Sequence, residues 1–231
     1  MRTDVKGRDA RLVGFYLDAK QLVLRSGFAD EIGWQESVRL SSIDGTDVRR
    51  ELAWVVLSSG MRERVVRSVF DRISEIFCRW RDDDSILGNP SAFINAALRA
   101  FNHPRKIGAI VENIATFARM GLADFRTQLA AQGPPFLMCF SFIGPVTCWH
   151  LAKNLGVDVA KPDRHLVRLA RATGSNDVTD LCSQISTFTG DRVAVIDLIL
   201  WRYATIVSDY ESRVQSLLAP VHIETAPHQS T

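Results

Sequence analysis

Apolar residues recur at helical spacing along almost the whole 231-residue chain. Near the N-terminus, Leu12, Phe15 and Ala19 show this spacing, which places them on one face of a helix. No segment alternates between apolar and polar residues for long enough to form a strand. The sequence therefore predicts an all-α protein of about ten helices.

Helix boundaries are indicated by capping residues, Pro and Gly. Asn89-Pro90 and His103-Pro104 are typical of helix starts, and Gly121 is typical of a helix end. Several glycines over residues 26–45 favour a loop, which contains Trp34. Other expected boundaries are N-caps at Thr46 or Asp47, at Ser175 or Asn176 and at Thr189, a helix start near Met61 and a helix over Phe125–Gln132.

Composition bounds the class of protein but says little about its partner. With 46% hydrophobic and 23% charged residues, the chain is able to bury a core as one compact unit or as two small lobes. The net charge of +2 is too small to indicate a nucleic-acid partner by itself. Residues 161–171 carry four basic side chains against one acidic one, which is typical of an anion-binding surface or of a solvated helix face.

The cysteines and the absence of long apolar runs indicate the compartment. Cys78, Cys139, Cys148 and Cys182 have no paired short spacing that would form a zinc or iron-sulfur site. The apolar neighbours of Cys139 and Cys148 predict buried free thiols and a reducing environment. Without a signal peptide or a bilayer-length apolar run, the expectation is a cytoplasmic protein with no membrane contact.

The most informative segment runs from Phe140 to Leu169. Its Gly144-Pro145 turn opens a helix that Gly156 closes, and Asp163 then stands at the mouth of another helix. The N-terminus of a helix has backbone N–H groups without intrahelical partners, so two such starts side by side would bind phosphate.

This segment resembles the helix-hairpin-helix, Gly/Pro-rich-loop and Asp (HhH-GPD) signature of the DNA glycosylase superfamily that includes endonuclease III, adenine glycosylase and 8-oxoguanine glycosylase. The resemblance rests on Gly144, Gly156 and the run Pro162-Asp163-Arg164-His165, in this order and spacing. Two departures stand out. The family's Leu-Pro-Gly-Val-Gly turn reads Phe-Ser-Phe-Ile-Gly over residues 140–144, and the lysine of strand-cleaving members is Val146.

The resemblance implies a two-lobed architecture and a DNA partner. A six-helix barrel over residues 46–160 would face a second helical lobe from residues 1–45 and 161–218, with a disordered tail over residues 219–231. DNA, expected to be double-stranded, would bind across the cleft to a monomeric protein. No cofactor is implied beyond a monovalent cation held by main-chain carbonyls of the hairpin.

The same resemblance assigns roles around the hairpin. Asp163 is the expected catalytic carboxylate, because negative charge under the sugar stabilises the positive charge that develops as the base leaves. Its alternative is a simple helix cap. The expected contacts to the DNA backbone come from Gly144, Val146, Thr147, Lys161, Arg164, His165 and Arg62.

A base pocket is expected from three parts of the chain. In the turn Ser58-Ser59-Gly60, the resemblance places Gly60 where the family has a gap-filling Gln. Either Met61 or Arg62 then acts as the wedge, or the pocket admits something large. Asp197 and Trp201, one helical turn apart, match positions that read and stack on the flipped base. Trp34 and Trp201 have a plain alternative as core residues.

These expectations favour a monofunctional DNA glycosylase that releases a modified base. A cytosine derivative is slightly preferred over an altered purine, because an Asp accepts from an exocyclic amine. The roomy turn also fits a bulky base such as the glucosylated hydroxymethylcytosine of phage DNA, which would indicate phage defence rather than repair. Two alternatives stay open, a glycosylase-lyase using Lys153 or Lys161 and a noncatalytic DNA-binding module.

Overall fold

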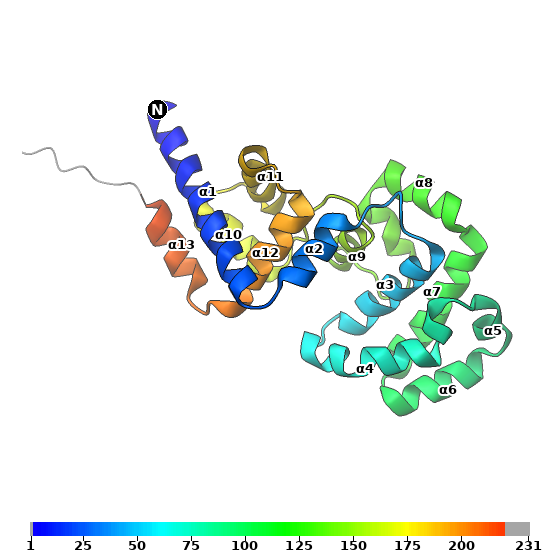
Figure 1. The fold of residues 1–231 in the computed structure, drawn as a ribbon. Helices are drawn as coiled ribbons and strands as arrows, with labels where there is room; N and C mark the ends of the chain where they lie inside the picture. The colour runs from blue at the N-terminus through cyan, green and yellow to red at the C-terminus, as the bar shows by residue number, and fades with distance from the viewer. Residues whose placement is uncertain (1, 220–231) are drawn as a thin grey trace, which may run out of the picture.

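The computed structural model describes residues 2–219, with side chains from residue 7 onward, and these residues form helices and loops without strands. The predicted all-α class is confirmed for this part of the chain. Figure 1 shows two groups of helices that lie side by side and meet at a narrow junction. The α-helices are labelled α1 to α13, more than the roughly ten expected, because several are short and have little periodicity of their own.

The middle lobe, as we call it, has a core of buried apolar residues between Ile43 and Leu155. The turns between its helices are short, so neighbouring helices pack against one another to close this core. Its elements are α3 (Gly45–Ser58), α4 (Glu63–Ile76), the 3-10 helix η1 (Cys78–Trp80), α5 (Asp83–Gly88), α6 (Pro90–Ala100), α7 (Pro104–Met120), α8 (Leu122–Gln132), the 3-10 helix η2 (Pro134–Cys139) and α9 (Thr147–Asn154).

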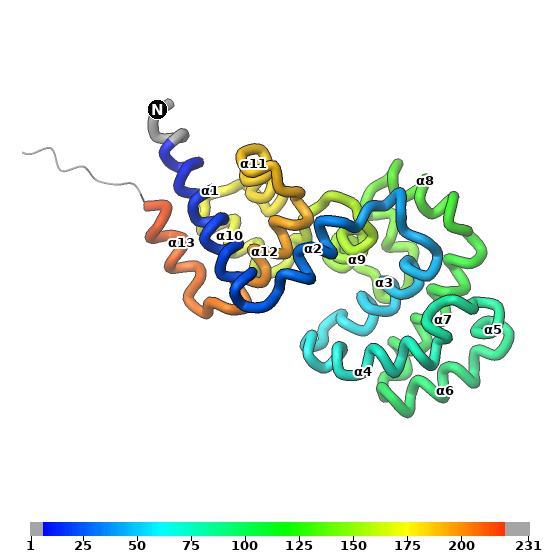
Figure 2. Tube along the Cα trace, in the orientation of Figure 1, coloured from blue at the N-terminus to red at the C-terminus, as the bar shows by residue number. Residues whose placement is uncertain are grey.

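The terminal lobe has a second core, built from residues 12–32 and 160–214. Both ends of the described chain therefore lie in this lobe, and the chain crosses between the lobes twice (Figure 2). Its helices are α1 (Arg2–Arg25), α2 (Ala29–Ser37), α10 (Arg164–Thr173), α11 (Val178–Thr189), α12 (Val193–Ile206) and α13 (Tyr210–Leu218). That the lobes are separate domains stays a prediction, and the expected disordered tail lies outside the described residues beyond Ala219.

The loop predicted over residues 26–45 is wrong in its first half, where α2 forms. Ile32 and Gln35 are buried on one face of this helix, and Glu31 pairs with Arg202 of α12. A nine-residue helix gains little from its own propensity, so these tertiary contacts explain why it forms. Trp34 consequently lies on a helix rather than in a loop.

Several helix starts differ from the predicted ones. Asp44 caps α3 by accepting from the Asp47 N–H at 2.9 Å, and the Asp47 carboxylate accepts from the Asp44 N–H at 2.9 Å, a capping box one turn wide. Asp177, not Ser175 or Asn176, caps α11. The start of α12 follows Arg192 without a side-chain cap, so the prediction at Thr189 is wrong as well. An N-cap residue has an extended backbone. Where several polar residues are adjacent, the sequence does not show which of them adopts it.

The segment that precedes the hairpin turn also differs from expectation. The helix predicted over Phe125–Gln132 is present as α8, but η2 lies between it and the turn. Because η2 packs on α9 and α8 packs on η2, the segment next to α9 is η2.

Polar interactions dominate where the lobes meet. From the start of α12, the Arg192 guanidinium donates to the carbonyls of Gln35 and Val38 at 2.9 and 3.0 Å and to that of Gly156 at 3.0 Å. At the other end of α12, Arg202 pairs with Glu31 of α2 and Glu63 of α4. One helix of the terminal lobe thus holds both chain crossings and the start of α4.

The two crossings touch at Gly156. This residue ends α9 with φ at 86°, and a Cβ placed on it would lie 2.5 Å from the Arg39 carbonyl carbon. Both the backbone conformation and the close approach require glycine at this position.

We predict that Gly156→Ala lowers the free energy of unfolding by about 3 kcal/mol, because the left-handed backbone and the backbone clash each carry a cost. Gly144→Ala is the matched control, since a Cβ there would meet only Thr147 Oγ1 at 3.9 Å. Urea denaturation measures both. Equal stability of the two variants would contradict the close packing of the crossings.

Candidate active site

The hairpin turn keeps a glycine-like backbone without the glycine. Phe142 stands where the resembling family has its first hairpin Gly, and its φ is 65°, in the left-handed region. Asn113 of α7, buried, holds the preceding residue on both sides: it accepts from the Ser141 N–H at 2.7 Å and donates to the Ser141 carbonyl at 3.0 Å. This clamp offsets the strain of a non-glycine residue in that conformation.

The start of α9 is open to an anion. The Gly144 N–H donates to the Thr147 hydroxyl at 2.7 Å, and the Gly144 carbonyl accepts from the Cys148 N–H at 2.9 Å. Within residues 2–219, no acceptor is found for the backbone N–H groups of Val146 and Thr147, and the Val146 side chain is exposed. The backbone N–H groups of Val146 and Thr147 are therefore free to bind phosphate, while that of Gly144 is engaged within the turn.

The start of α10 is closed by Asp163 itself. Its Oδ1 accepts from the N–H groups of His165 and Leu166 at 2.9 and 3.1 Å. Its Oδ2 lies 3.9 Å from Lys161 Nζ, and the side chain is 14% exposed. One oxygen thus fixes the carboxylate, and the other is left to act on something outside the helix. The start of α10 thus offers fewer open amides than that of α9, and phosphate binding at both helix starts stays a prediction.

Asp197 anchors the linker that leads to Asp163. This residue of α12 is buried; its Oδ1 accepts from the Lys161 N–H at 2.7 Å and its Oδ2 pairs with Lys153 Nζ of α9. Burial raises the pKa of Asp197, and the ion pair with Lys153 opposes this shift. Both oxygens are engaged within the protein, so a role in reading a base is not what this arrangement offers. The sequence showed a buried carboxylate but not its partner.

Trp201 packs against the core of the terminal lobe. Its indole lies against the Arg202 guanidinium, 4.5 Å from the ring centroid, and this guanidinium also covers the Phe28 ring at 4.3 Å. The plain core interpretation is the one that these contacts favour. Trp34, in contrast, is 40% exposed and lines a pocket with Glu51 and Asn154.

The expected wedge turn is held by a buried lysine that the sequence analysis missed. Lys106 Nζ of α7 donates to the carbonyls of Leu57 and Ser59, each at 2.6 Å. An ammonium at the C-terminal end of α3 is favoured by the helix dipole, while burial lowers the pKa of Lys106. In this turn Ser58, Ser59 and Met61 are partly buried, whereas Gly60 and Arg62 are exposed and face solvent.

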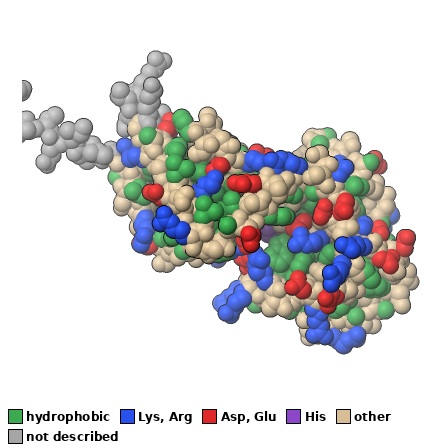
Figure 3. Space-filling view, viewed as in Figure 1, with side chains coloured by type: hydrophobic (Ala, Val, Ile, Leu, Met, Phe, Trp, Pro, Cys, Tyr) green, Lys and Arg blue, Asp and Glu red, His purple; other side chains and the backbone are tan. Residues whose placement is uncertain are grey.

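The basic side chains predicted to contact DNA differ in exposure and in the contacts that they make within the protein. Arg164 is exposed, whereas Lys161 is partly buried and burial lowers its pKa. The ring of His165 is tied at Nδ1 to the Tyr210 hydroxyl of α13, 3.3 Å away, and at Nε2 to Arg164 Nε at 3.3 Å. Figure 3 shows Lys and Arg side chains on both sides of the narrowing between the lobes. Contact of these residues with phosphate stays a prediction.

His150 is a second residue that the sequence analysis missed. It lies on α9 one turn after Thr147, and burial, together with the positive charges of Lys161 and Lys153, lowers its pKa well below the ordinary 6.5. A neutral imidazole is therefore present near Lys161 at pH 7. The sequence signal for His150 was its position three residues after Thr147, which puts the two side chains on one face of α9.

The described residues bear on metal binding, membrane spans and the burial of the cysteines. No group of three or more His, Cys, Asp or Glu in residues 2–219 is arranged to hold a metal ion. In the same range, none of the helices combines the length and apolar character of a membrane span. Cys148 is buried as predicted, but Cys139 is exposed because it ends η2 at the surface, so that prediction is wrong.

No family model, curated protein or solved structure matches this chain. The function is therefore argued from the geometry around Asp163 and from the resemblance of its segment.

We predict a specific acid dependence of stability from His150. Below about pH 6.5 the unfolded chain binds a proton that the folded His150 does not, so the free energy of unfolding falls as pH drops through this range and is full above it. His150→Gln should therefore lose less stability than the parent between about pH 7.5 and about pH 5. Urea denaturation at both pH values gives the comparison, and parallel pH profiles would show that His150 is not buried in a neutral form.

Proposed function

We propose that the protein is a monofunctional DNA glycosylase that hydrolyses the bond between a modified base and its deoxyribose. The observation that carries this proposal is the Asp163 carboxylate: one oxygen is fixed by two backbone N–H groups, and the other lies 3.9 Å from Lys161 Nζ. Together with the open start of α9, this supplies a negative charge for the sugar and donors for a phosphate.

In the proposed reaction the C1′–N bond breaks and its electron pair leaves with the base. Asp163 stabilises the positive charge on the sugar, a water oxygen forms the new bond to C1′, and the water proton goes to a nearby base. The outward oxygen of Asp163, Oδ2, is our candidate for that base, because Oδ1 alone is engaged by the two backbone N–H groups. The released base takes a proton from solvent, and an abasic site remains.

DNA would lie across the junction with the target base rotated out of the duplex. The N–H groups of Val146 and Thr147 would bind one phosphate, and Arg62, Lys161 and Arg164 would add cationic contacts. The substrate class we propose is a modified base, with a cytosine derivative or a bulky glucosylated cytosine favoured. This leaves repair and phage defence as the two settings.

We predict that Asp163→Asn binds abasic DNA with unchanged affinity but releases base at least about a hundredfold more slowly, because Asn keeps the cap and removes the charge. Asp177→Asn is the matched control, since Asp177 caps α11 in the same way. Single-turnover assays on oligonucleotides with single modified bases, and on glucosylated DNA, measure abasic sites. Near-normal turnover by Asp163→Asn would remove Asp163 from the mechanism.

A glycosylase-lyase is the second candidate, and Lys161 rather than Lys153 is the residue that favours it. Burial lowers the pKa of Lys161, which is 3.9 Å from Asp163, whereas Lys153 is buried and engaged with Asp197. A less basic amine is the better nucleophile for a Schiff base.

Because we propose hydrolysis without a covalent step, we predict no protein–DNA adduct when borohydride is added during turnover. An adduct that disappears in Lys161→Arg would establish the lyase instead. If the parent protein binds DNA but forms neither abasic sites nor an adduct on any substrate, it is a noncatalytic DNA-binding module.

A further inference from the structure

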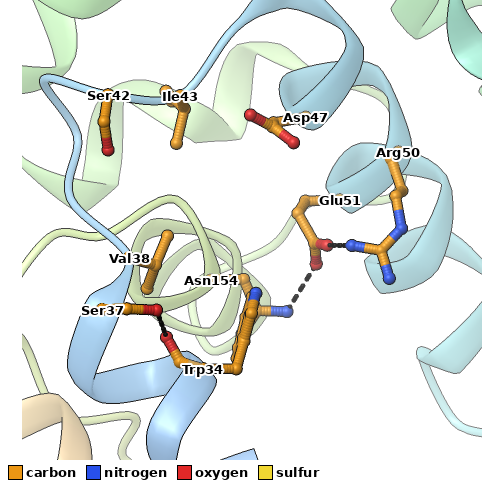
Figure 4. A pocket seen from close by; sticks show the side chains of 9 residues that line it. All are labelled: Trp34, Ser37, Val38, Ser42, Ile43, Asp47, Arg50, Glu51 and Asn154. Atoms are coloured by element: carbon orange, nitrogen blue, oxygen red, sulfur yellow. Dashed lines mark hydrogen bonds and ion pairs between the residues drawn. The ribbon is translucent and has the colours of Figure 1, made fainter.

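A solvent-open pocket of about 230 Å³ lies where α2 and the loop after it meet α3 and the end of α9. Figure 4 shows its polar residues converging from these elements on one space. The hairpin turn lies at the other end of α9. Trp34 was expected in the base pocket, but the mechanism proposed above uses no residue of this pocket.

One wall of the pocket is the indole of Trp34. This side chain is 40% exposed, which is unusual for a residue with so large an apolar area. Neither core includes it. Trp34 therefore offers a flat apolar surface beside polar groups, the arrangement in which an indole binds a ligand ring.

The polar side of the pocket is prearranged. Asn154 is 7% exposed and donates from Nδ2 to Glu51 Oε2 at 2.9 Å, while Arg50 Nη1 donates to Glu51 Oε1 at 2.6 Å. The Glu51 side chain is 7% exposed and burial raises its pKa. Among residues 2–219 no donor reaches Asn154 Oδ1, so the amide oxygen of this pocket residue is left for a ligand hydroxyl or amine.

The chemistry of the lining selects the class of ligand. Two carboxylates, of Asp47 and Glu51, line the pocket, and the one guanidinium, of Arg50, is already paired with Glu51. This balance disfavours a phosphate or another anion. A nucleobase presents two flat faces, but the pocket offers a single aromatic wall. A hexose has one face of C–H groups for an indole and a rim of hydroxyls for carboxylate and amide groups.

We propose that this pocket binds a neutral hexose ring, with its C–H face on Trp34 and a hydroxyl on the amide oxygen of Asn154, which Glu51 holds in place. The hexose is either a free sugar or one carried by a modified base in DNA. The second source rests on the proposed function and deepens it, because it makes a sugar-bearing base the substrate class.

Saturation-transfer NMR with methyl α- and β-D-glucopyranoside tests the pocket in the full chain. We expect the parent protein to bind one anomer, and Trp34→Ala to bind it about tenfold more weakly through loss of the aromatic contact. Trp34→Phe should retain most of the binding. Phe188→Ala, which removes an aromatic side chain that is 59% exposed on α11, is the matched control and should bind as the parent does.

No binding of either glucoside by the parent, or equal binding by Trp34→Ala, would overturn the proposal. Binding of cytidine in place of the glucosides, lost in Trp34→Ala, would overturn it in favour of a base site. Thermal unfolding of each variant confirms that it is folded before binding is compared.

Base release distinguishes the two sources of the hexose. If the sugar is carried by DNA, the parent should release glucosylated hydroxymethylcytosine faster than hydroxymethylcytosine, and Trp34→Ala should lose this preference while Phe188→Ala keeps it. Glucoside binding without release of any base would overturn the glycosylase proposal and leave the hexose pocket standing. Base release without glucoside binding would overturn the hexose pocket and leave the glycosylase proposal standing.

Discussion

The buried carboxylate of Asp197 is the interaction on which the geometry of the candidate site depends. It joins Lys153 of α9 to the backbone N–H of Lys161, and these two segments carry the turn proposed to bind phosphate and the start of α10. A buried charge is tolerated only when it is paired and hydrogen-bonded, so the pairing fixes the linker in one arrangement. Asp163, two residues after Lys161, is thereby placed at a defined distance from α9.

The junction between the lobes is held by charge more than by apolar packing. Arg192 binds three main-chain carbonyls on the two crossings, and Arg202 bridges α2 and α4 through two glutamates. Because each lobe has its own apolar core, the lobes need only a polar contact to keep their relative position. A polar junction also leaves room for the two openings proposed as sites, at the start of α9 and beside Trp34.

The sequence was most informative where local chemistry decides the structure. Asp163 before an amphipathic segment predicted both the helix and its cap, and Gly156 predicted the end of α9. Phe142 shows the opposite case: it replaces a glycine of the resembling family, and its left-handed backbone follows Ser141, which Asn113 holds from 28 residues away. The partner of Asp197 lies 44 residues away and was equally invisible. Local patterns therefore located the candidate carboxylate, while long-range pairs decided which other residues accompany it.

The most direct measurement is a crystal structure of the protein with duplex DNA that carries an abasic-site analogue. We predict that a phosphate lies on the N–H groups of Val146 and Thr147, and that Asp163 Oδ2 faces C1′ of the extrahelical sugar. DNA bound on another surface, or a sugar remote from Asp163 with α10 unchanged, would contradict the proposed mechanism.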